Sequence, residues 1–444
     1  MPEPTSGVFE PLLAAAQSEQ RLPSVGATVF HAGEIVWEQA LGLADVERGE
    51  GATLDHQYRV GSITKTFTAV LVMRLVAAGR FELDAPLRSL IPECRPGPTV
   101  RHALSHLSGL QREPAGEVWE TLRIPTREEL LAGLEDAELI LQPGSAWHYS
   151  NLAFALLGEV VVRGYGAPFP EVVTRELLAP LGLTRTSIAP TGLTATPYFV
   201  DPYSDRVHVE PDLAVTETTS AAGWLWSTPR DLARWADFLS LGDERILAKA
   251  QLDRMATVEA MVDEASWTLG WGLGLELYRR DRYVLAGHGG AMPGFLAAFC
   301  VHRPTRTGSA VVMNTGAGAE PEKLALDLAE EALRRFPAPA QPWHPSADVP
   351  DEIAPLLGRW WTEGSELILG HRGGRFVAEL VGGPPGRSES ILEADGVDRF
   401  RVTSGRERGE LLRIVRDEGG AVVKLYFATY PLTRHASTFG EAAR

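Results

Sequence analysis

The chain has 444 residues, of which 44% are hydrophobic and 23% are charged, values typical of globular proteins that argue against a disordered, collagen-like or coiled-coil chain. Its 42 basic and 58 acidic residues give a net charge of −16, and a surface with this surplus of carboxylates repels phosphate backbones and anionic lipid heads. Nucleic acids and membranes are therefore not expected as partners.

The first elements that the sequence predicts are two short strands, residues 26–31 and 34–43. Both runs are rich in β-branched and apolar side chains, and the turn-prone pair Ala32 and Gly33 separates them. This pattern indicates a β-hairpin near the start of the chain.

Two helices are predicted in the middle of the chain, at residues 63–78 and 152–163. Apolar side chains lie nearly all the way round each of them, which predicts helices that are buried in a core. Because glycine favours the C-terminal ends of helices, we expect Gly79 and Gly164 to end them.

Three further strands, residues 283–286, 294–302 and 308–314, precede an amphipathic helix at 320–336. Strands at both ends with helices between them predict an α+β domain whose antiparallel sheet is built from both ends of the domain. We expect the helical part to pack beside this sheet and the domain to span residues 1–336.

A proline-rich stretch, residues 337–350, follows this domain. Proline at such density prevents both helices and sheet ladders and is typical of a semi-rigid linker. The last part of the chain, residues 351–444, contains short apolar runs joined by glycine-rich turns. We interpret as strands the runs 359–362, 366–369, 375–380, 399–402, 411–415 and 422–427. Their regular spacing predicts a small all-β sandwich or barrel.

Ser62 and Lys65 form a Ser-x-x-Lys pair at the start of the predicted helix 63–78. Positions three apart share one face of a helix, so the hydroxyl and the amine can meet as a nucleophile and its base. Such a base must be neutral, and burial can lower a lysine pKa by up to ~3–5 units. Chance also produces this tetrapeptide, but the chain has only four lysines, and Lys65 alone has a serine three residues before it.

A second segment, residues 143–151, leads directly into the predicted helix 152–163 and contains Tyr149 and Asn151. A phenol can relay a proton when an ammonium group lies close to it, and an asparagine amide can contact a lysine or a substrate carbonyl. The alternative is that Asn151 or Ser150 only caps the helix.

A third segment, residues 287–295, places three glycines around His288. Glycine weakens a strand unless a ligand or another backbone approaches it closely, so the segment is typical of an edge strand that lines a cleft. The alternative is a glycine-rich turn between the strands 283–286 and 294–302.

The three segments, in this order and at these spacings, resemble the serine β-lactamase and penicillin-binding protein superfamily. The resemblance is strongest to its class C-like branch of esterases, D-aminopeptidases and D-Ala-D-Ala carboxypeptidase-like proteins. It covers nearly all of residues 8–336 and includes the segments 58–62, 101–110, 222–233 and 269–274. It implies a β-lactamase-like antiparallel sheet flanked by helices, with a helical subdomain.

The resemblance also implies roles for individual residues. Ser62 would be the acylated nucleophile, Lys65 its activating partner and Tyr149 the proton relay. Asn151 would contact Lys65 and the substrate, and the backbone N–H groups of Ser62 and Ala291 would form the oxyanion hole. The residues that would line the substrate as a strand motif are His288, Gly289 and Gly290.

β-Lactamases proper carry a lysine and a hydroxyl in this strand motif, whereas His288 is mostly neutral near pH 7 and Gly289 has no hydroxyl. A strong anchor for the carboxylate of a β-lactam is therefore lacking. We expect ester or amide hydrolysis of small-molecule or short peptide substrates. The alternatives are a D-amino-acid-specific peptidase, a weak β-lactamase, and a catalytically silent binding or scaffold protein.

The C-terminal residues 351–444 resemble the lipocalin-like barrel that follows some D-aminopeptidase-type members of the superfamily. The motif Gly358-Arg359-Trp360 carries this resemblance. Two interpretations are open: the barrel is an independent module that covers one edge of the catalytic domain, or one of its loops shapes the substrate cleft.

No cofactor is expected, and no metal, because His102 and His106 lack the glutamate of a zinc-protease motif. The two cysteines, Cys94 and Cys300, are too few for a disulfide framework, and we expect both to be buried. The N-terminus lacks the features of a secretory signal, and the apolar runs are shorter than the ~20 residues of a membrane span. We therefore expect a cytoplasmic protein.

Overall fold

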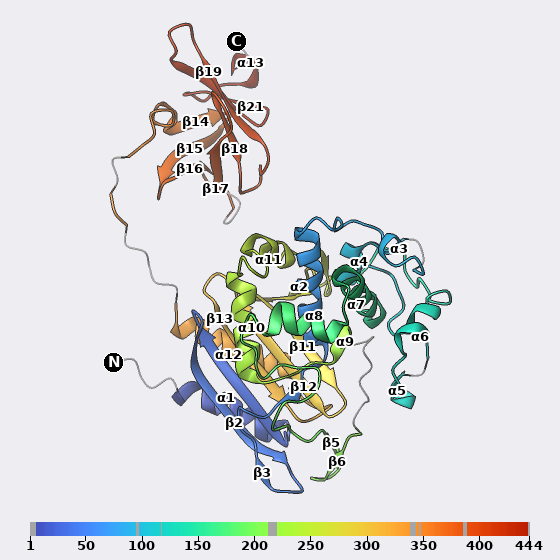
Figure 1. Ribbon diagram of the computed structural model, residues 1–444. Coiled ribbons are helices and arrows are strands. Elements are labelled where there is room, and N and C mark those ends of the chain that lie inside the picture. Colours follow the sequence, from blue (N-terminus) through green and yellow to red (C-terminus); the bar gives the residue numbers. More distant parts are fainter. Residues whose placement is uncertain are drawn as a thin grey trace. The chain divides into compact units, whose positions relative to one another are not determined.

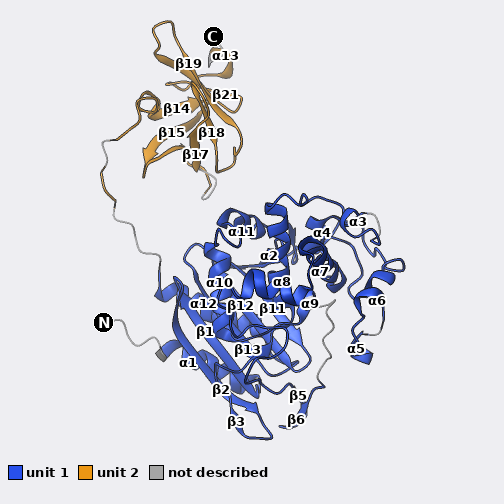
Figure 2. Ribbon diagram, in the orientation of Figure 1, with its two compact units in different colours: residues 1–339 blue, residues 340–444 orange. Residues whose placement is uncertain are grey.

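The computed structural model of the chain describes residues 6–94, 97–116, 118–211, 220–337, 343–345, 348–384 and 389–442. The chain divides into two compact units, residues 1–339 and 340–444, which are blue and orange in Figure 2. Parts of the predicted linker 337–350, namely 338–342 and 346–347, lie outside the described residues.

A nine-stranded antiparallel sheet forms the centre of the first unit, in the order β3-β2-β1-β13-β12-β11-β10-β9-β8 (Figure 1). Its strands are β1 (Ser24–His31), β2 (Glu34–Asp45), β3 (Glu50–Gly51), β8 (Ala260–Met261), β9 (Leu269–Trp271), β10 (Glu276–Arg280), β11 (Tyr283–Met292), β12 (Phe295–His302) and β13 (Thr307–Met313). The predicted hairpin is β1–β2, and β1 also pairs with β13. The two ends of the domain therefore meet in one sheet, as the sequence predicts.

The two faces of this sheet carry two separate cores, because side chains alternate along each strand. On β12, Ala298 and Cys300 belong to the core that includes helices α1 and α12. Phe299 and Val301 point to the opposite face and join the core of helices α2, α7 and α10. These helices are α1 (Ser6–Glu19), α2 (Thr64–Ala77), α7 (Asn151–Tyr165), α10 (Pro229–Leu241) and α12 (Pro321–Arg335).

Helices α2 and α7 are the two buried helices that the sequence predicts, and they pack closely on each other. Gly79, with φ 67°, follows the end of α2 as predicted. Gly164 does not end α7; the helix continues to Tyr165, and Gly166 caps it at φ 69°. A Cβ on Gly164 would lie 2.5 Å from Cδ1 of Leu75 on α2, so this glycine permits the close helix contact.

Shorter elements complete the first unit. The helical ones are α3 (Leu87–Leu90), α4 (Val100–Leu104), α5 (Val118–Thr121), α6 (Arg127–Ala132), α8 (Phe169–Val173), η2 (Thr174–Leu178), α9 (Ser220–Gly223) and α11 (Lys249–Met255). Two small antiparallel pairs join β4 (Tyr58–Arg59) to β7 (Trp226–Ser227) and β5 (Tyr198–Val200) to β6 (Val207–Val209). Both cysteines are buried, as predicted.

No described helix is by itself long and apolar enough to cross a bilayer. One pair, α7 with the segment Phe169–Leu178, meets both requirements only when the two parts are taken together, and it is bent by 74°.

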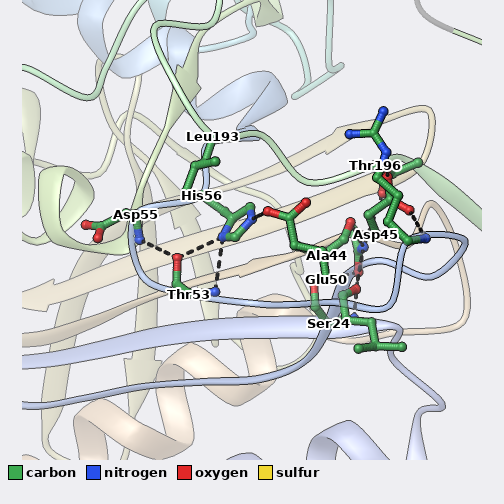
Figure 3. Close-up of polar contacts among 12 residues, drawn as sticks. Ser24, Ala44, Asp45, Glu50, Thr53, Asp55, His56, Leu193 and Thr196 are labelled. Carbon is green, nitrogen blue, oxygen red and sulfur yellow. Dashed lines mark hydrogen bonds and ion pairs between the residues drawn. The ribbon is translucent and has the colours of Figure 1, made fainter.

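A polar cluster fixes the chain between β3 and β4, just before the predicted nucleophile (Figure 3). His56 is only 1% exposed, and its Nδ1 accepts the backbone N–H of Thr53 at 3.1 Å. Its Nε2 lies 3.0 Å from Oε1 of Glu50 on β3. Two residues further on, the Tyr58 hydroxyl lies 2.9 Å from Oγ of Ser24 on β1. These contacts join the hairpin to the segment that enters the candidate site.

The second unit is a nearly closed antiparallel barrel. Its eight strands are β14 (Gly358–Thr362), β15 (Ser365–Arg372), β16 (Arg375–Leu380), β17 (Glu389–Ala394), β18 (Arg399–Val402), β19 (Leu411–Arg416), β20 (Val422–Phe427) and β21 (Tyr430–Leu432), in this order. Trp361 and Thr433 exchange backbone hydrogen bonds of 2.9 and 3.0 Å, which bring the first and last strands together. The turn η3 (Ala354–Leu356) precedes the barrel, and α13 (Phe439–Ala442) follows it. The all-β prediction is confirmed as a barrel.

Candidate active site

Ser62 lies in a tight helical turn, η1 (Gly61–Ile63), directly before α2. Gly61 has φ 49°, and a Cβ on it would lie 2.6 Å from the backbone nitrogen of Ala291. Glycine therefore allows this turn to pack against strand β11. The serine is placed between the positive end of the α2 dipole and the backbone of Ala291.

The structure brings together Ser62, Lys65 and Tyr149. The Lys65 Nζ atom lies 3.0 Å from Ser62 Oγ, as the spacing of three residues on one helix face predicts. The Tyr149 hydroxyl donates a hydrogen bond of 2.8 Å to the same oxygen, from a residue 87 positions away. The nucleophile candidate thus has two proton carriers within hydrogen-bond distance.

Lys65 is fully buried, as the sequence predicts, although it is not without partners. Its Nζ donates a hydrogen bond of 2.6 Å to the carbonyl oxygen of Ala222 on α9. Burial lowers the pKa of Lys65 to about 7, against the opposing effect of the nearby Glu113 carboxylate. A large fraction of the amine is therefore neutral near pH 7.

Tyr149 is held by His106, which belongs to the segment 101–110 that carries the resemblance and for which no metal was expected. The ring of His106 stacks on Tyr149 with centroids 4.3 Å apart, and its Nδ1 accepts the Ser150 N–H at 3.0 Å. Burial raises the pKa of the Tyr149 phenol and lowers that of the His106 imidazole well below its usual value. Near neutral pH the phenol therefore keeps its proton.

Asn151 contacts a different residue from the one expected. Its Nδ2 donates a hydrogen bond of 2.7 Å to Glu113 Oε1, whereas the amine of Lys65 is occupied by Ser62 and Ala222. The helix cap of α7 is Ser150, whose Oγ accepts the Ala153 N–H at 3.0 Å. Asn151 still lines the cavity at Ser62.

The residues His288, Gly289 and Gly290 lie inside the continuous strand β11, so the alternative of a glycine-rich turn is wrong. The strand is not at the edge of the sheet, because β10 and β12 flank it. However, β10 pairs with β11 only as far as Gly287, opposite Glu276. The following part of β11 pairs with β12 alone and presents a local edge to the cavity.

His288 is 1% exposed, and its Nδ1 donates to the Gly289 carbonyl at 2.5 Å. Burial lowers the pKa of His288 to about 3, so the imidazole is neutral, as expected. Beside it, the carboxylate of Glu276 accepts hydrogen bonds from the Tyr278 hydroxyl and the Gly289 N–H. Burial raises the pKa of Glu276 to about 7.

Two cavities meet at Ser62 and differ in character. The first, of about 80 Å³, has a mainly apolar lining that includes Val118, Ile124 and Trp224. The second, of about 820 Å³, is wider and more polar, and His288 to Met292 form part of its wall. The site can therefore hold a small apolar group next to a larger polar one.

Sequence reasoning missed Ala222, Glu276 and Glu113 as parts of the site. Ala222 acts through its carbonyl oxygen, which no sequence pattern reveals, although the residue lies in the segment 222–233 that carried the resemblance. The two glutamates have no motif around them. Only the folded chain identifies them as site residues, because there both glutamates line the same cavity as Ser62.

Fold and site together define a β-lactamase-like α+β domain followed by a barrel. Residues 8–334 match the family model described as Beta-lactamase, and the chain therefore belongs to this family. Residues 349–434 match a domain of unknown function, DUF7586. The resemblance of the barrel to lipocalins thus remains a prediction.

Individual relatives fit this assignment. The chain is similar to Esterase EstB of Burkholderia gladioli, with 39% identity over 187 residues, 38% of this chain and 47% of the esterase. The match thus spans about half the length of that relative. Among solved structures it is similar to the D-stereospecific amidohydrolase from Streptomyces sp., at 27% identity, with 72% of this chain and 98% of that one covered and a TM-score of 0.61. The octameric penicillin-binding protein homologue from Pyrococcus abyssi shares the fold, at 23% identity, 97% and 100% coverage and a TM-score of 0.66.

Proposed function

We propose that the protein is a serine hydrolase that cleaves ester or amide bonds of small substrates through an acyl-enzyme on Ser62. The observation that carries this proposal is that a buried lysine amine and a partly buried tyrosine hydroxyl lie 3.0 and 2.8 Å from one serine oxygen. Membership of the β-lactamase family and similarity to an esterase and an amidohydrolase support it.

Acylation begins with the attack of Ser62 Oγ on the substrate carbonyl carbon. Neutral Lys65 takes the hydroxyl proton, because its pKa of about 7 makes the free base available at neutral pH. Tyr149 cannot be the first base while it keeps its own proton. When the tetrahedral intermediate collapses, Tyr149 gives that proton to the leaving group and regains one from the Lys65 ammonium.

The backbone N–H groups of Ser62 and Ala291 serve as the oxyanion hole in this proposal. Gly61 supports it, because the glycine brings the turn that carries Ser62 against the backbone of Ala291. Water then attacks the acyl carbonyl, with Lys65 and Tyr149 returning the proton to Ser62. The neutral His288 offers no cation for a carboxylate, which favours simple esters and amides over β-lactams.

A substrate panel tests the proposal. The purified protein is incubated with p-nitrophenyl butyrate, nitrocefin and D-alanine p-nitroanilide, and chromophore release is followed. We expect release from the ester to be fastest. No release from any of the three, together with no adduct after fluorophosphonate treatment, would favour the binding or scaffold alternative.

Tyr149→Phe is expected to lower the acylation rate by at least ~100-fold, because the variant keeps the ring but loses the only hydroxyl that donates to Ser62 Oγ among the described residues. The rate is measured as kcat/KM for ethyl butyrate in a pH-stat, because an alkoxide leaving group needs the proton of Tyr149. The circular dichroism spectrum controls for folding. An unchanged kcat/KM would remove Tyr149 from the mechanism.

The pH dependence of kcat/KM follows from the lowered pKa of Lys65. Only the neutral amine accepts a proton, so activity on an uncharged ester should rise about tenfold per pH unit below 7 and level off above it. A pH-stat measures this profile with p-nitrophenyl butyrate between pH 5 and 9. A flat profile across pH 6 to 8 would argue against Lys65 as the base.

A further inference from the structure

The two cavities at Ser62 share a boundary. The residues that line both of them include Ser62, Glu113, Asn151 and Ala291. The hydrogen bond of 2.7 Å from Asn151 Nδ2 to Glu113 Oε1 therefore lies on this boundary, next to the nucleophile candidate. A substrate whose carbonyl carbon is at Ser62 can thus extend one of its two parts into each cavity.

The position of Tyr149 assigns the two parts of the substrate to the two cavities. Tyr149 lines the large cavity and does not belong to the lining of the small one. Its hydroxyl lies 2.8 Å from Ser62 Oγ and, in the proposed reaction, gives its proton to the leaving group. The leaving group therefore lies on the Tyr149 side, in the large cavity. Because the acyl chain points in a different direction from the tetrahedral carbon, the small cavity is the space that remains for it.

The walls of the small cavity are apolar and come from several elements. The residues that line this cavity alone include Val118 of α5, Ile124, Ala155 of α7 and Trp224. Ile124, Ala155 and Trp224 are buried, with at most 6% exposed. Ala155 follows Asn151 by four residues, so both lie on the face of α7 that is turned to the cavity. The small side chain of Ala155 leaves room there for an acyl chain.

The volume of the small cavity limits the length of that chain. An apolar cavity of about 150 Å³ holds a benzene ring, so the cavity of about 80 Å³ has room for about three carbon atoms. Three carbon atoms beyond the carbonyl make a butyryl group. The wider cavity, of about 820 Å³, sets no comparable limit on the leaving group.

We propose that the small cavity selects substrates with an apolar acyl group of up to about four carbon atoms, and that the large cavity takes the alcohol or amine that leaves. This inference rests on the proposed hydrolase function and names its substrate class, which is short-chain esters or amides of larger alcohols or amines. Each methylene group that enters the apolar cavity should raise kcat/KM about fourfold. Methylene groups beyond the butyryl length no longer fit.

Two isomeric esters test the orientation of the substrate. Hexyl acetate and ethyl hexanoate contain the same atoms, but the long chain belongs to the leaving group in the first and to the acyl group in the second. We expect kcat/KM, measured in a pH-stat, to be higher for hexyl acetate by about tenfold or more. With p-nitrophenyl esters, kcat/KM should rise from acetate to butyrate and fall at hexanoate and octanoate.

Two variants change the small cavity in opposite directions. Ile124→Ala enlarges it and should raise the ratio of kcat/KM for p-nitrophenyl hexanoate over butyrate by about tenfold. Ala155→Val narrows it and should lower the ratio for butyrate over acetate by about tenfold. Ala132→Val makes the same substitution at an exposed position of α6 outside both linings and should preserve both ratios. A variant that only disturbs folding would lower all rates together and leave the preferred chain length unchanged.

The outcomes separate the acyl cavity from the reaction. Hydrolysis of ethyl hexanoate as fast as that of hexyl acetate, or a kcat/KM that rises through octanoate, would overturn the inference and leave the hydrolase intact. If no ester is hydrolysed, calorimetric titration of the protein with the isomeric amides N-hexylacetamide and N-ethylhexanamide decides the question. Tighter binding of N-hexylacetamide, with a preference that Ile124→Ala reduces, would support the inference, and equal binding would overturn it.

Discussion

Ser62→Ala is expected to reduce the hydrolysis of p-nitrophenyl butyrate by about 10⁴-fold or more, to a rate close to that of the uncatalysed reaction. The effect is this large because the variant removes the atom that forms the acyl-enzyme, and without it Lys65 and Tyr149 have no nucleophile to assist. The measurement is steady-state kcat/KM with the purified variant.

The matched control for this variant is Ser145→Ala, which removes an exposed hydroxyl that bonds to the Gln142 carbonyl. It should keep the activity of the unmodified protein. Retention of more than about one per cent of the activity in Ser62→Ala would contradict the assignment of Ser62 as nucleophile.

Lys65→Met should have two opposite effects: loss of activity and gain of stability. Removal of a general base lowers rates by about 10²–10⁴-fold. The pKa of Lys65 falls from 10.5 to about 7 on folding. A charged amine at this position therefore lowers the free energy of unfolding by roughly 5 kcal/mol. The variant leaves the Ala222 carbonyl unpaired, at a cost of about 1–3 kcal/mol. The expected net gain at pH 6 is therefore about 2–4 kcal/mol.

The pH dependence of this gain has a definite sign. Folding lowers the pKa of Lys65, so between pH 7 and pH 10.5 the unfolded chain binds more protons than the folded chain. The stability penalty of the buried amine is therefore complete below pH 7 and disappears towards pH 10.5. Urea denaturation of both proteins at pH 6 and pH 9.5 measures it. Lys249→Met, at an exposed lysine paired with Asp253, is the control. Lower stability of Lys65→Met at pH 6 would contradict a costly buried amine.

The sequence predicted the core of the fold because its patterns there are local. Buried strands such as β12 and buried helices such as α2 are marked by continuous apolar runs. Strand β10 was missed because charged residues, among them Arg279 and Arg280, occupy three of its five positions. Helix α1 was missed as well, and Pro11 lies within it.

The candidate site was predictable where residues lie close together in sequence. Ser62 and Lys65 share one helix face, so their spacing alone places them together. Tyr149 came from a segment that the resemblance marked. Glu113 and Glu276 were not predicted, because they lie far from the motif residues in the sequence and no local pattern links them to the site.

The central claim is that Ser62 carries the acyl group during turnover. The most direct test is rapid-quench mass spectrometry of the protein mixed with p-nitrophenyl butyrate, followed by peptide mapping. We expect a transient butyryl adduct on Ser62 that forms and decays fast enough to account for the steady-state rate. Turnover with no adduct on Ser62, or with the adduct on another residue, would contradict the account.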